Sequence, residues 1–441
     1  MPESAAPRII IDMPPFFRSM ARAITAAITL FVWTSACVTS PGAGSAVDDA
    51  IAARARFFNP QAVPSELVEA LRPHRLVLLG ESHYVQEHQD FVVLLLRELH
   101  PHGLRWFADE LSHASGWAVD DFVRGLRDDP PPSVVRMNET YLNGLRAFNA
   151  TLPPSERIRF RYIDMNHNPT AFQTSLQMMI RETDLSPVAA EIVEVLASDP
   201  YDEDYLEALH ALERAIAPDR STGAAVQAGA SVVLRDRAAD LWFHRLRETL
   251  EVEIRSFPLR LQWDVAEREL IMIDLVNAIL DESGNDMVAV NTGMFHAQRQ
   301  RFMGTRQEWL GEYLVRNSQL TQGAEPGSQS GFYAIAFFGM RGERIRHSRD
   351  QQPQPMRPLA ELPQRNLSRR IADAAASAAA GDEAIPAVFL PLDQKAFERR
   401  MLVSYGFSPV RAIPARQFDA FVVYPEVSVL RSLQATWYTA P

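Results

Sequence analysis

The stretch RLVLLGESHYVQEHQDF, Arg75 to Phe91, joins an apolar run to a cluster of titratable side chains. The run RLVLLG (75–80) is short and rich in leucine and valine, which predicts a buried β-strand. In QEHQDFVVLLLREL, which follows it, apolar residues recur at spacings of three and four, which predicts a helix. A strand that passes directly into a helix is typical of an α/β fold with a parallel sheet.

Six further apolar runs indicate strands between long helical stretches. They are LRWFAD (104–109), IRFRYID (158–164), MVAVNT (287–292), FYAIAFF (332–338), AVFLP (387–391) and AFVVYP (420–425). The helical region at about 170–283 is too long for one crossover, so we expect a large inserted helical subdomain there. The fold class is therefore α/β, with a mainly parallel central sheet flanked by helices, in one domain over 56–441.

Composition excludes one class of partner. The chain has 441 residues, a net charge of −11 and no basic cluster. Proteins that bind nucleic acid normally carry a basic surface that displaces the counterions of the phosphates, so we expect no nucleic-acid partner. A small-molecule substrate is the expected partner, and the sequence leaves the oligomeric state open.

The single cysteine, Cys37, follows a short apolar run and two small residues in MARAITAAITLFVWTSAC. This pattern predicts a bacterial lipoprotein signal over 1–37, with Cys37 as the lipidated residue and 38–55 as a flexible tether. The alternatives are an ordinary cleaved signal or an unprocessed anchor. The expected location is the cell envelope, where a lipid anchor at Cys37 would attach the chain to the membrane on its periplasmic or extracellular face. A lone cysteine excludes disulfides within the chain.

The ends of the predicted strands carry the candidate site. In parallel sheets, ligands bind beyond the carboxyl ends of the strands, where neighbouring loops converge. Four residues at these ends have no simple structural role, because a buried charge without a partner is costly; they are Glu81, His83, Glu110 and His296. Five more are expected to support them: Glu87, His88, Asp109, Asp164 and Asn291.

Structural alternatives exist for several of these residues. His88 fits a helix face as well as a site, and Asp109 and Asp164 fit helix caps. Arg268, in the long helical region, is expected to be a solvated helix charge.

Carboxylates and imidazoles together allow two kinds of chemistry. A nucleophile elbow, a P-loop, a dinucleotide fingerprint and an H-E-x-x-H helix are all missing from the sequence. A histidine held by a carboxylate can deprotonate water directly, which needs no cofactor. Alternatively, Glu81, His83, Glu110 and His296 can hold a divalent metal ion that activates the water.

Several motifs together resemble the erythromycin esterase-like superfamily, which includes ChaN-like haem-binding lipoproteins and Tiki-type metalloproteases. They are LLGESHYVQEHQDF, LRWFADE, YLNGLRAFNATLPPSERIRFRYIDMN, DMVAVNTGMFHAQRQRFMGTRQEWLGEYL and FDAFVVYPEVSVLRSL, spread over about 65–440. The resemblance implies an α/β fold with helical decoration. It places the family's functional residues at Glu81, His83, Glu110 and His296, with Glu87 matching a further acidic position.

The resemblance favours a hydrolase that cleaves an ester, lactone or related bond, with His83 as the base that activates water. One residue, Ser82, separates Glu81 from His83, and Tyr84 follows, whereas the esterases have two residues and a glycine, so a macrolide substrate is not indicated. The first alternative is a ChaN-like haem- or metal-binding lipoprotein with His83, His88 and Tyr84 as ligands. The second is a metal-dependent hydrolase that uses the same residues.

Overall fold

Eight strands form the central sheet of the computed structural model, and five adjacent pairs of them run parallel. Across the sheet the order is β1 (Arg56–Phe58), β9 (Ala387–Pro391), β12 (Ala420–Tyr424), β6 (Phe332–Gly339), β2 (Leu76–Glu81), β5 (Met287–Gly293), β3 (Leu104–Ser112) and β4 (Arg159–Asp164). The strands β1 and β9 run antiparallel to their neighbours. The predicted α/β class is confirmed, and all of the strands expected from the sequence are present.

The structure describes residues 43–129, 135–182, 188–217, 230–301, 306–317, 331–345, 352–379, 384–405 and 409–433. Cys37 and the rest of the predicted signal lie outside these ranges. By its internal contacts the chain divides into Met1–Ala46 and Val47–Pro441, and the fold described here belongs to the second unit.

Side chains alternate across the sheet and build two apolar cores. On β2, Leu76 and Leu78 point into one core, and Val77 and Leu79 into the other. This two-residue period follows from the pleat of a strand. Because both faces are covered, every position of β2 up to Gly80 is buried, which explains why the sequence shows a continuous apolar run.

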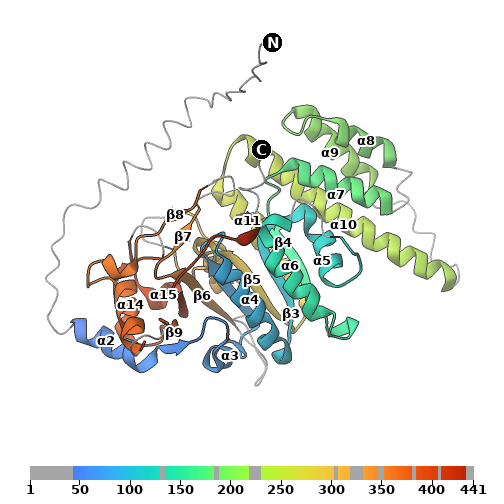
Figure 1. The fold of residues 1–441 in the computed structure, drawn as a ribbon. Coiled ribbons are helices and arrows are strands. Elements are labelled where there is room, and N and C mark those ends of the chain that lie inside the picture. Colours follow the sequence, from blue (N-terminus) through green and yellow to red (C-terminus); the bar gives the residue numbers. More distant parts are fainter. Residues whose placement is uncertain are drawn as a thin grey trace, which may run out of the picture. The chain divides into compact units, whose positions relative to one another are not determined.

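Helices cover both faces of the sheet (Figure 1). On one side lie α3 (Ser65–Leu71), α4 (Gln86–Leu99), α5 (Gly116–Val123) and α6 (Val135–Asn149). On the other lie α11 (Val265–Ser283), α13 (Leu310–Asn317) and α14 (Leu367–Ala378). The apolar stripe of each helix packs on the sheet, as expected for a layered α/β domain.

The sequence analysis expected an inserted helical subdomain at about 170–283, and the structure has five helices among the described residues of this region. Four of them share a separate core, in which Phe172, Leu209 and Leu250 are buried. They are α7 (Pro169–Glu182), α8 (Ala189–Ala197), α9 (Glu203–Ala215) and α10 (Ala230–Leu261), and Figure 1 shows them gathered beside the sheet. The fifth, α11, packs on β4 and β5 and belongs to the sheet domain. This boundary matters because α11 reaches the site.

The helix α2 (Ala43–Arg54) occupies most of the segment that the sequence analysis expected to be a flexible tether. Val47, Ala50 and Ile51 are buried in the sheet's core. The expectation is therefore wrong for 43–54, because spacings of three and four give this alanine-rich segment an apolar stripe.

Small ribbons and short strands were not predicted from the sequence. β7 (Glu343–Arg344) pairs with β8 (Gln354–Pro355), and β10 (Met401–Val403) pairs with β11 (Val410–Ala412). These segments are too short to show a periodic pattern.

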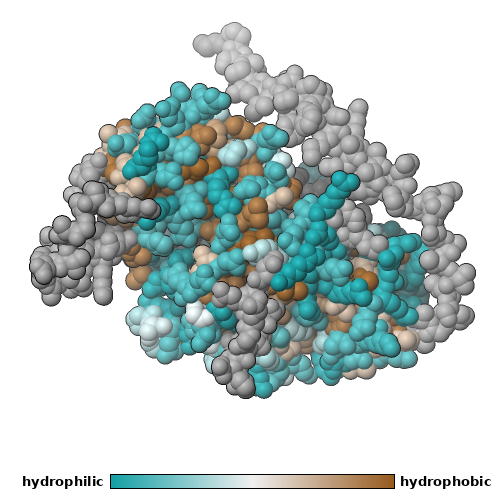
Figure 2. Space-filling view, turned by 180° about the vertical axis from the view of Figure 1, so that it is seen from behind, coloured by the Kyte–Doolittle hydropathy of each residue, from teal (hydrophilic) through white to brown (hydrophobic). Residues whose placement is uncertain are grey.

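The surface is mixed in polarity. Figure 2 shows hydrophilic residues over most of one face, with hydrophobic residues interspersed among them. Within the described ranges, no helix combines the length and the apolar character that a membrane span requires.

Candidate active site

The carboxyl ends of β2, β5, β3 and β4 bring the predicted residues together. Glu81 is the last residue of β2, Glu110 lies near the end of β3, and Asp164 ends β4. His296 lies in α12 (Met294–Ala297), which directly follows β5. Because these strands are adjacent and parallel, their ends meet at one edge of the sheet.

Glu81 holds two histidines. Nδ1 of His83 lies 2.9 Å from Oε1 of Glu81, and Nε2 of His88 lies 3.2 Å from Oε2 of Glu81. The His88 side chain is only 1% exposed, so the structure places it in the site and not on a solvated helix face. Tyr141 of α6 also donates to Oε2 of Glu81, at 3.4 Å.

Asn291 connects this group to Asp109. Its Nδ2 donates to Oε2 of Glu81 at 3.1 Å and to Oδ1 of Asp109 at 2.7 Å. The amide nitrogen must face these carboxylates, so the amide oxygen faces His88, at 2.8 Å from its Nε2. His88 Nε2 therefore carries the proton. Asp109 and Asn291 thus join the pair of Glu81 and His88 in one hydrogen-bonded network.

Glu110 forms the second half of the site. Its Oε2 accepts a hydrogen bond from the backbone N–H of Gly293 at 2.5 Å, and its Oε1 lies 3.2 Å from Nε2 of His296. Gly293 is needed here, because a Cβ at that position would lie 2.8 Å from Nε2 of His83 and 3.3 Å from Glu110. His83 and Glu110 therefore both approach Gly293, and Glu110 also contacts His296.

Arg268 of α11 was expected to be a solvated helix charge, and this expectation is wrong. Its guanidinium donates to Glu110 and also to Asp164, at 2.9 Å from Nε to Oδ1 and 2.6 Å to Oδ2. Asp164 also binds Nε2 of His167, at 2.7 Å. Asp164 therefore does more than cap a helix, because it fixes the position of Arg268.

Glu269, the next residue of α11, was missed by the sequence analysis. Its Oε1 lies 2.5 Å from Nδ1 of His296, and its Oε2 accepts from the backbone N–H of Leu310. The side chain is 1% exposed. It stands on the buried stripe of α11 with Met272 and Val276, and a charge on such a stripe is the signal that could have found it.

These contacts shift the pKa values of the site. Burial alone would raise the pKa of Glu81, but the hydrogen bonds from His83 and His88 lower it to about 2. Burial would lower the pKa of His83, but Glu81 and the charge of Glu110 raise it to about 9. In the same way, Glu110 and Glu269 outweigh burial and raise the pKa of His296 to about 10. The site is thus a set of ion pairs at neutral pH.

Two further acidic residues of the site, Glu110 and Asp164, also have lowered pKa values. Burial opposes the charge of Glu110, but His296, His83 and Arg268 hold its pKa well below the usual range. Burial would likewise raise the pKa of Asp164, but Arg268 and His167 lower it to about 2.

Glu87 lies outside this network. Its carboxylate accepts from the backbone N–H of Ser428 at 2.7 Å and from the Ser428 hydroxyl at 2.6 Å. It therefore anchors the segment after β12 onto the start of α4.

Tyr84, between His83 and this anchor, adopts a φ of 66°, a left-handed conformation that is rare outside glycine. Its carbonyl accepts from Leu430 N–H, so the same segment holds the turn that presents His83.

His83 differs from its neighbours in exposure. Its side chain is 49% exposed, against 13% for Glu81, 7% for Glu110 and 8% for His296. It stands at a cavity of about 290 Å³, which His88 and His296 also line. The apolar wall of this cavity comprises Val85, Met294, Phe295, Phe337, Phe338, Ile345, Met356 and Val427.

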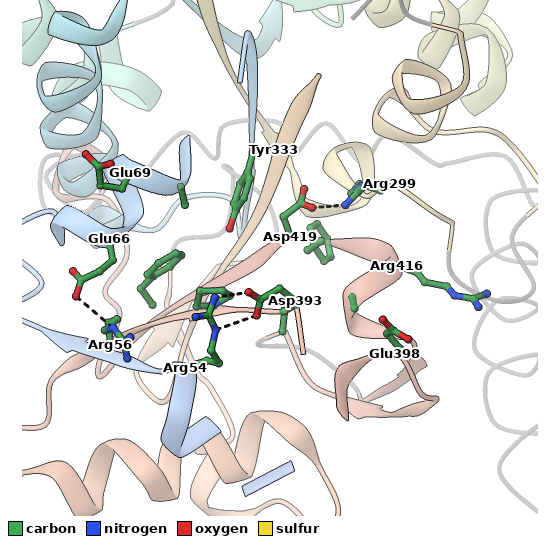
Figure 3. Close-up of a pocket in the computed structure, with 16 residues that line it drawn as sticks. Arg54, Arg56, Glu66, Glu69, Arg299, Tyr333, Asp393, Glu398, Arg416 and Asp419 are labelled. Atoms are coloured by element: carbon green, nitrogen blue, oxygen red, sulfur yellow. Dashed lines mark hydrogen bonds and ion pairs between the residues drawn. The ribbon is translucent and has the colours of Figure 1, made fainter. Parts of the chain in front are cut away.

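A larger cavity, of about 730 Å³, lies elsewhere (Figure 3). Tyr333 and Asp419, which line it, stand at the amino ends of β6 and β12, so it opens at the opposite edge of the sheet. Figure 3 shows Asp393 facing Arg54 and Asp419 facing Arg299, and both pairs are in hydrogen-bond contact. The described residues that line it include no histidine, so the smaller cavity is the better candidate for catalysis.

A metal ion does not fit the predicted ligand set. Within the described ranges, no group of three or more His, Cys, Asp or Glu residues is arranged to hold one. Glu110 is already bound by the Arg268 cation and by Gly293 N–H, which makes it a poor metal ligand.

Haem ligation by His88 is not favoured either, because the His88 ring is enclosed and its Nε2 contacts Asn291 and Glu81.

No protein-family model matches the sequence, and no curated protein matches it. Solved structures do share its fold. A succinoglycan biosynthesis protein superposes with a TM-score of 0.63 at 12% identity, over 89% of this chain and 100% of its own. A Bacillus cereus protein gives 0.61 at 12% identity, over 88% and 98%.

A variant of the erythromycin esterase EreC in its open conformation gives a TM-score of 0.57 at 16% identity, over 85% of this chain and 98% of its own. The chain therefore shares its fold with this esterase variant, as the resemblance of the motifs implied. At this level of identity the similarity concerns the fold, and the chemistry has to be argued from the site.

Proposed function

We propose that the protein hydrolyses an ester, lactone or related bond, with His83 as the base that activates water. The observation that carries this proposal is the combination of exposure and restraint at His83. Its ring is half exposed at a cavity, while Nδ1 is fixed by Glu81 at 2.9 Å. A histidine held in one orientation by a carboxylate, with its other nitrogen free to face substrate, is the usual form of a general base.

In the proposed reaction, Nε2 of His83 takes a proton from a water molecule, and the oxygen of that water attacks the carbonyl carbon. The C–O bond to the leaving group then breaks, and His83 returns the proton to the leaving oxygen. The products are a carboxylic acid and an alcohol. Glu81 keeps Nδ1 protonated, so the lone pair lies on Nε2 whenever the ring is neutral.

His296 would act through its charge. It lines the same cavity, its pKa is raised to about 10, and both ring nitrogens contact carboxylates. A cationic ring in this position favours the negative charge that develops on the carbonyl oxygen. Glu110 and Glu269 would keep His296 charged, and Arg268 would hold Glu110 in place.

We extend the proposal to location. Cys37 would be lipidated and would attach the protein to a membrane of the cell envelope. Incorporation of labelled palmitate into the full-length protein, and its loss in Cys37→Ser, would support this location. Equal incorporation by both proteins would contradict it.

Hydrolysis of para-nitrophenyl hexanoate tests the catalytic proposal, with spontaneous hydrolysis subtracted. His83→Ala should lower kcat/KM by about 100-fold or more, which is the usual contribution of a general base. His210→Ala is the matched control, because His210 is an exposed histidine on α9.

The hydrolytic activity of the wild-type protein should persist when a metal chelator is added. A loss of activity restored by a divalent metal would instead support the metal-dependent alternative.

A further inference from the structure

The cavity beside His83 is lined by both charged and apolar side chains. Its charged lining residues are Glu81, His83, His296 and Arg344. Its apolar lining includes Phe337 and Phe338, from the end of β6, with Ile345, Met356 and Val427. A ligand that fills this space must therefore join an apolar part to a group on which His83 can act.

The wall is held rigidly. A Cβ at Gly339 would lie 2.6 Å from Val427, and a Cβ at Gly342 would lie 1.9 Å from the Val427 carbonyl oxygen. Gly342 has a φ of 129°, which only glycine adopts readily. The two glycines thus let the segment after β12 pack directly against the end of β6, which fixes the far limit of the cavity.

The volume limits the size of that apolar part. At about 290 Å³, and with about 30 Å³ for each small group by comparison with liquid water, the cavity has room for about ten non-hydrogen atoms. A straight chain of about eight to ten carbons fits this space, whereas a macrolide does not.

The proposed chemistry decides which part of the ester enters. His83 takes a proton from water and returns it to the leaving oxygen, so both oxygens must reach Nε2 of His83. Nearly half of the His83 side chain is open to solvent, and water and the leaving alcohol can approach from there. The acyl group then extends the other way, into the cavity.

Building on the proposed hydrolase function, we propose that this cavity is an acyl-binding subsite that selects straight acyl chains of up to about ten carbons. Met356 and Ile345 set its size, because both side chains line the cavity and are nearly buried.

The test uses two measurements, of which the first does not depend on catalysis. Binding of straight-chain methyl ketones of increasing length is measured by calorimetry on the full-length protein, because a ketone carries the carbonyl but cannot be hydrolysed. Affinity should rise about fourfold per methylene, from the transfer of each CH₂ out of water, and should stop rising near ten carbons. Met356→Ala should move this limit to longer chains, and Ile345→Trp should move it to shorter ones.

Val193→Trp is the matched control for an added aromatic ring, because Val193 is 62% exposed on α8. It should leave the limit unchanged. Affinity that rises without a limit, or a limit that neither cavity variant moves, would overturn the proposed subsite.

The second measurement is hydrolysis of two ester series, one varied in the acyl chain and one in the alcohol. The limit should appear in the acyl series, and a limit in the alcohol series alone would overturn the acyl assignment. Ketone binding with the expected limit but no hydrolysis of any ester would contradict the hydrolase function while supporting an apolar-chain site.

Discussion

Arg268 donates a hydrogen bond to Glu110, and both side chains are almost enclosed, at 13% and 7% exposure. This pair joins α11 to the end of β3, and it brings a fixed positive charge next to His296. The positive charge of Arg268 on α11 and the negative charge of Glu110 at the sheet edge therefore compensate each other.

Removing Arg268 should destabilise the protein strongly. In Arg268→Ala, Glu110 and Asp164 lose a common cationic partner within a buried site. Breaking a buried pair in this way costs about 3–5 kcal/mol in the free energy of unfolding. Arg255→Ala is the control, because Arg255 pairs with Asp274 and Glu267, whose side chains are 60% and 43% exposed. That change should cost about 0–1 kcal/mol. Urea unfolding measures both, and equal losses would contradict the account.

Stability should depend on pH at both ends of the range. The pKa values of His83 and His296 are raised from 6.5 to about 9 and about 10, so their stabilisation is complete below pH 6.5 and is lost as the pH rises through these values. The pKa of Glu81 is lowered from 4.5 to about 2, so its stabilisation is complete above pH 4.5 and is lost as the pH falls toward 2. The free energy of unfolding should therefore be highest between these limits. His296→Gln should flatten the alkaline side, and an unchanged slope would refute the ion pairing of His296.

The rate of hydrolysis should rise with pH. With a His83 pKa of about 9, about one ring in a hundred is neutral at pH 7 and able to act as a base. The kcat/KM should increase about tenfold per pH unit and level off near pH 9. Glu81→Gln removes the main hydrogen-bonding partner of His83, so the plateau should begin at a lower pH and at a lower rate. If Glu81→Gln leaves the profile in place, His83 is not the group that titrates.

Gly293→Ala should impair activity more than stability. The added Cβ would lie 2.8 Å from His83 Nε2, and it would displace the ring from Glu110. We expect kcat to fall by about tenfold or more, because catalysis depends on the position of the base. Thermal unfolding distinguishes this effect from loss of fold. A variant with normal kcat would show that Nε2 of His83 does not act where the structure places it.

The strands and the residues at their ends were predictable because a strand that is buried on both faces of the sheet has a continuous run of apolar residues. Glu81, His83, Glu110 and His296 stand at the ends of such runs or just beyond them, so they could be found without knowing the contacts. Their pairing could not, because it depends on which strands lie side by side.

Arg268 and Glu269 were harder to find. They belong to a helix with many charges, where an inward charge and a solvated one look alike in the sequence. The buried stripe of α11 shows that Glu269 faces inward, but the direction of Arg268 follows only from Glu110 and Asp164, which are distant in the chain. The helix α2 was missed because its composition resembles that of a linker.

The most direct test of the central claim is the hydrolysis of para-nitrophenyl hexanoate by the full-length protein, by His83→Ala and by His210→Ala, at pH 7 and pH 9. We expect wild type and His210→Ala to be active and faster at pH 9, while His83→Ala retains the fold and loses the activity. Equal activity of His83→Ala and wild type at both pH values would show that His83 is not the base.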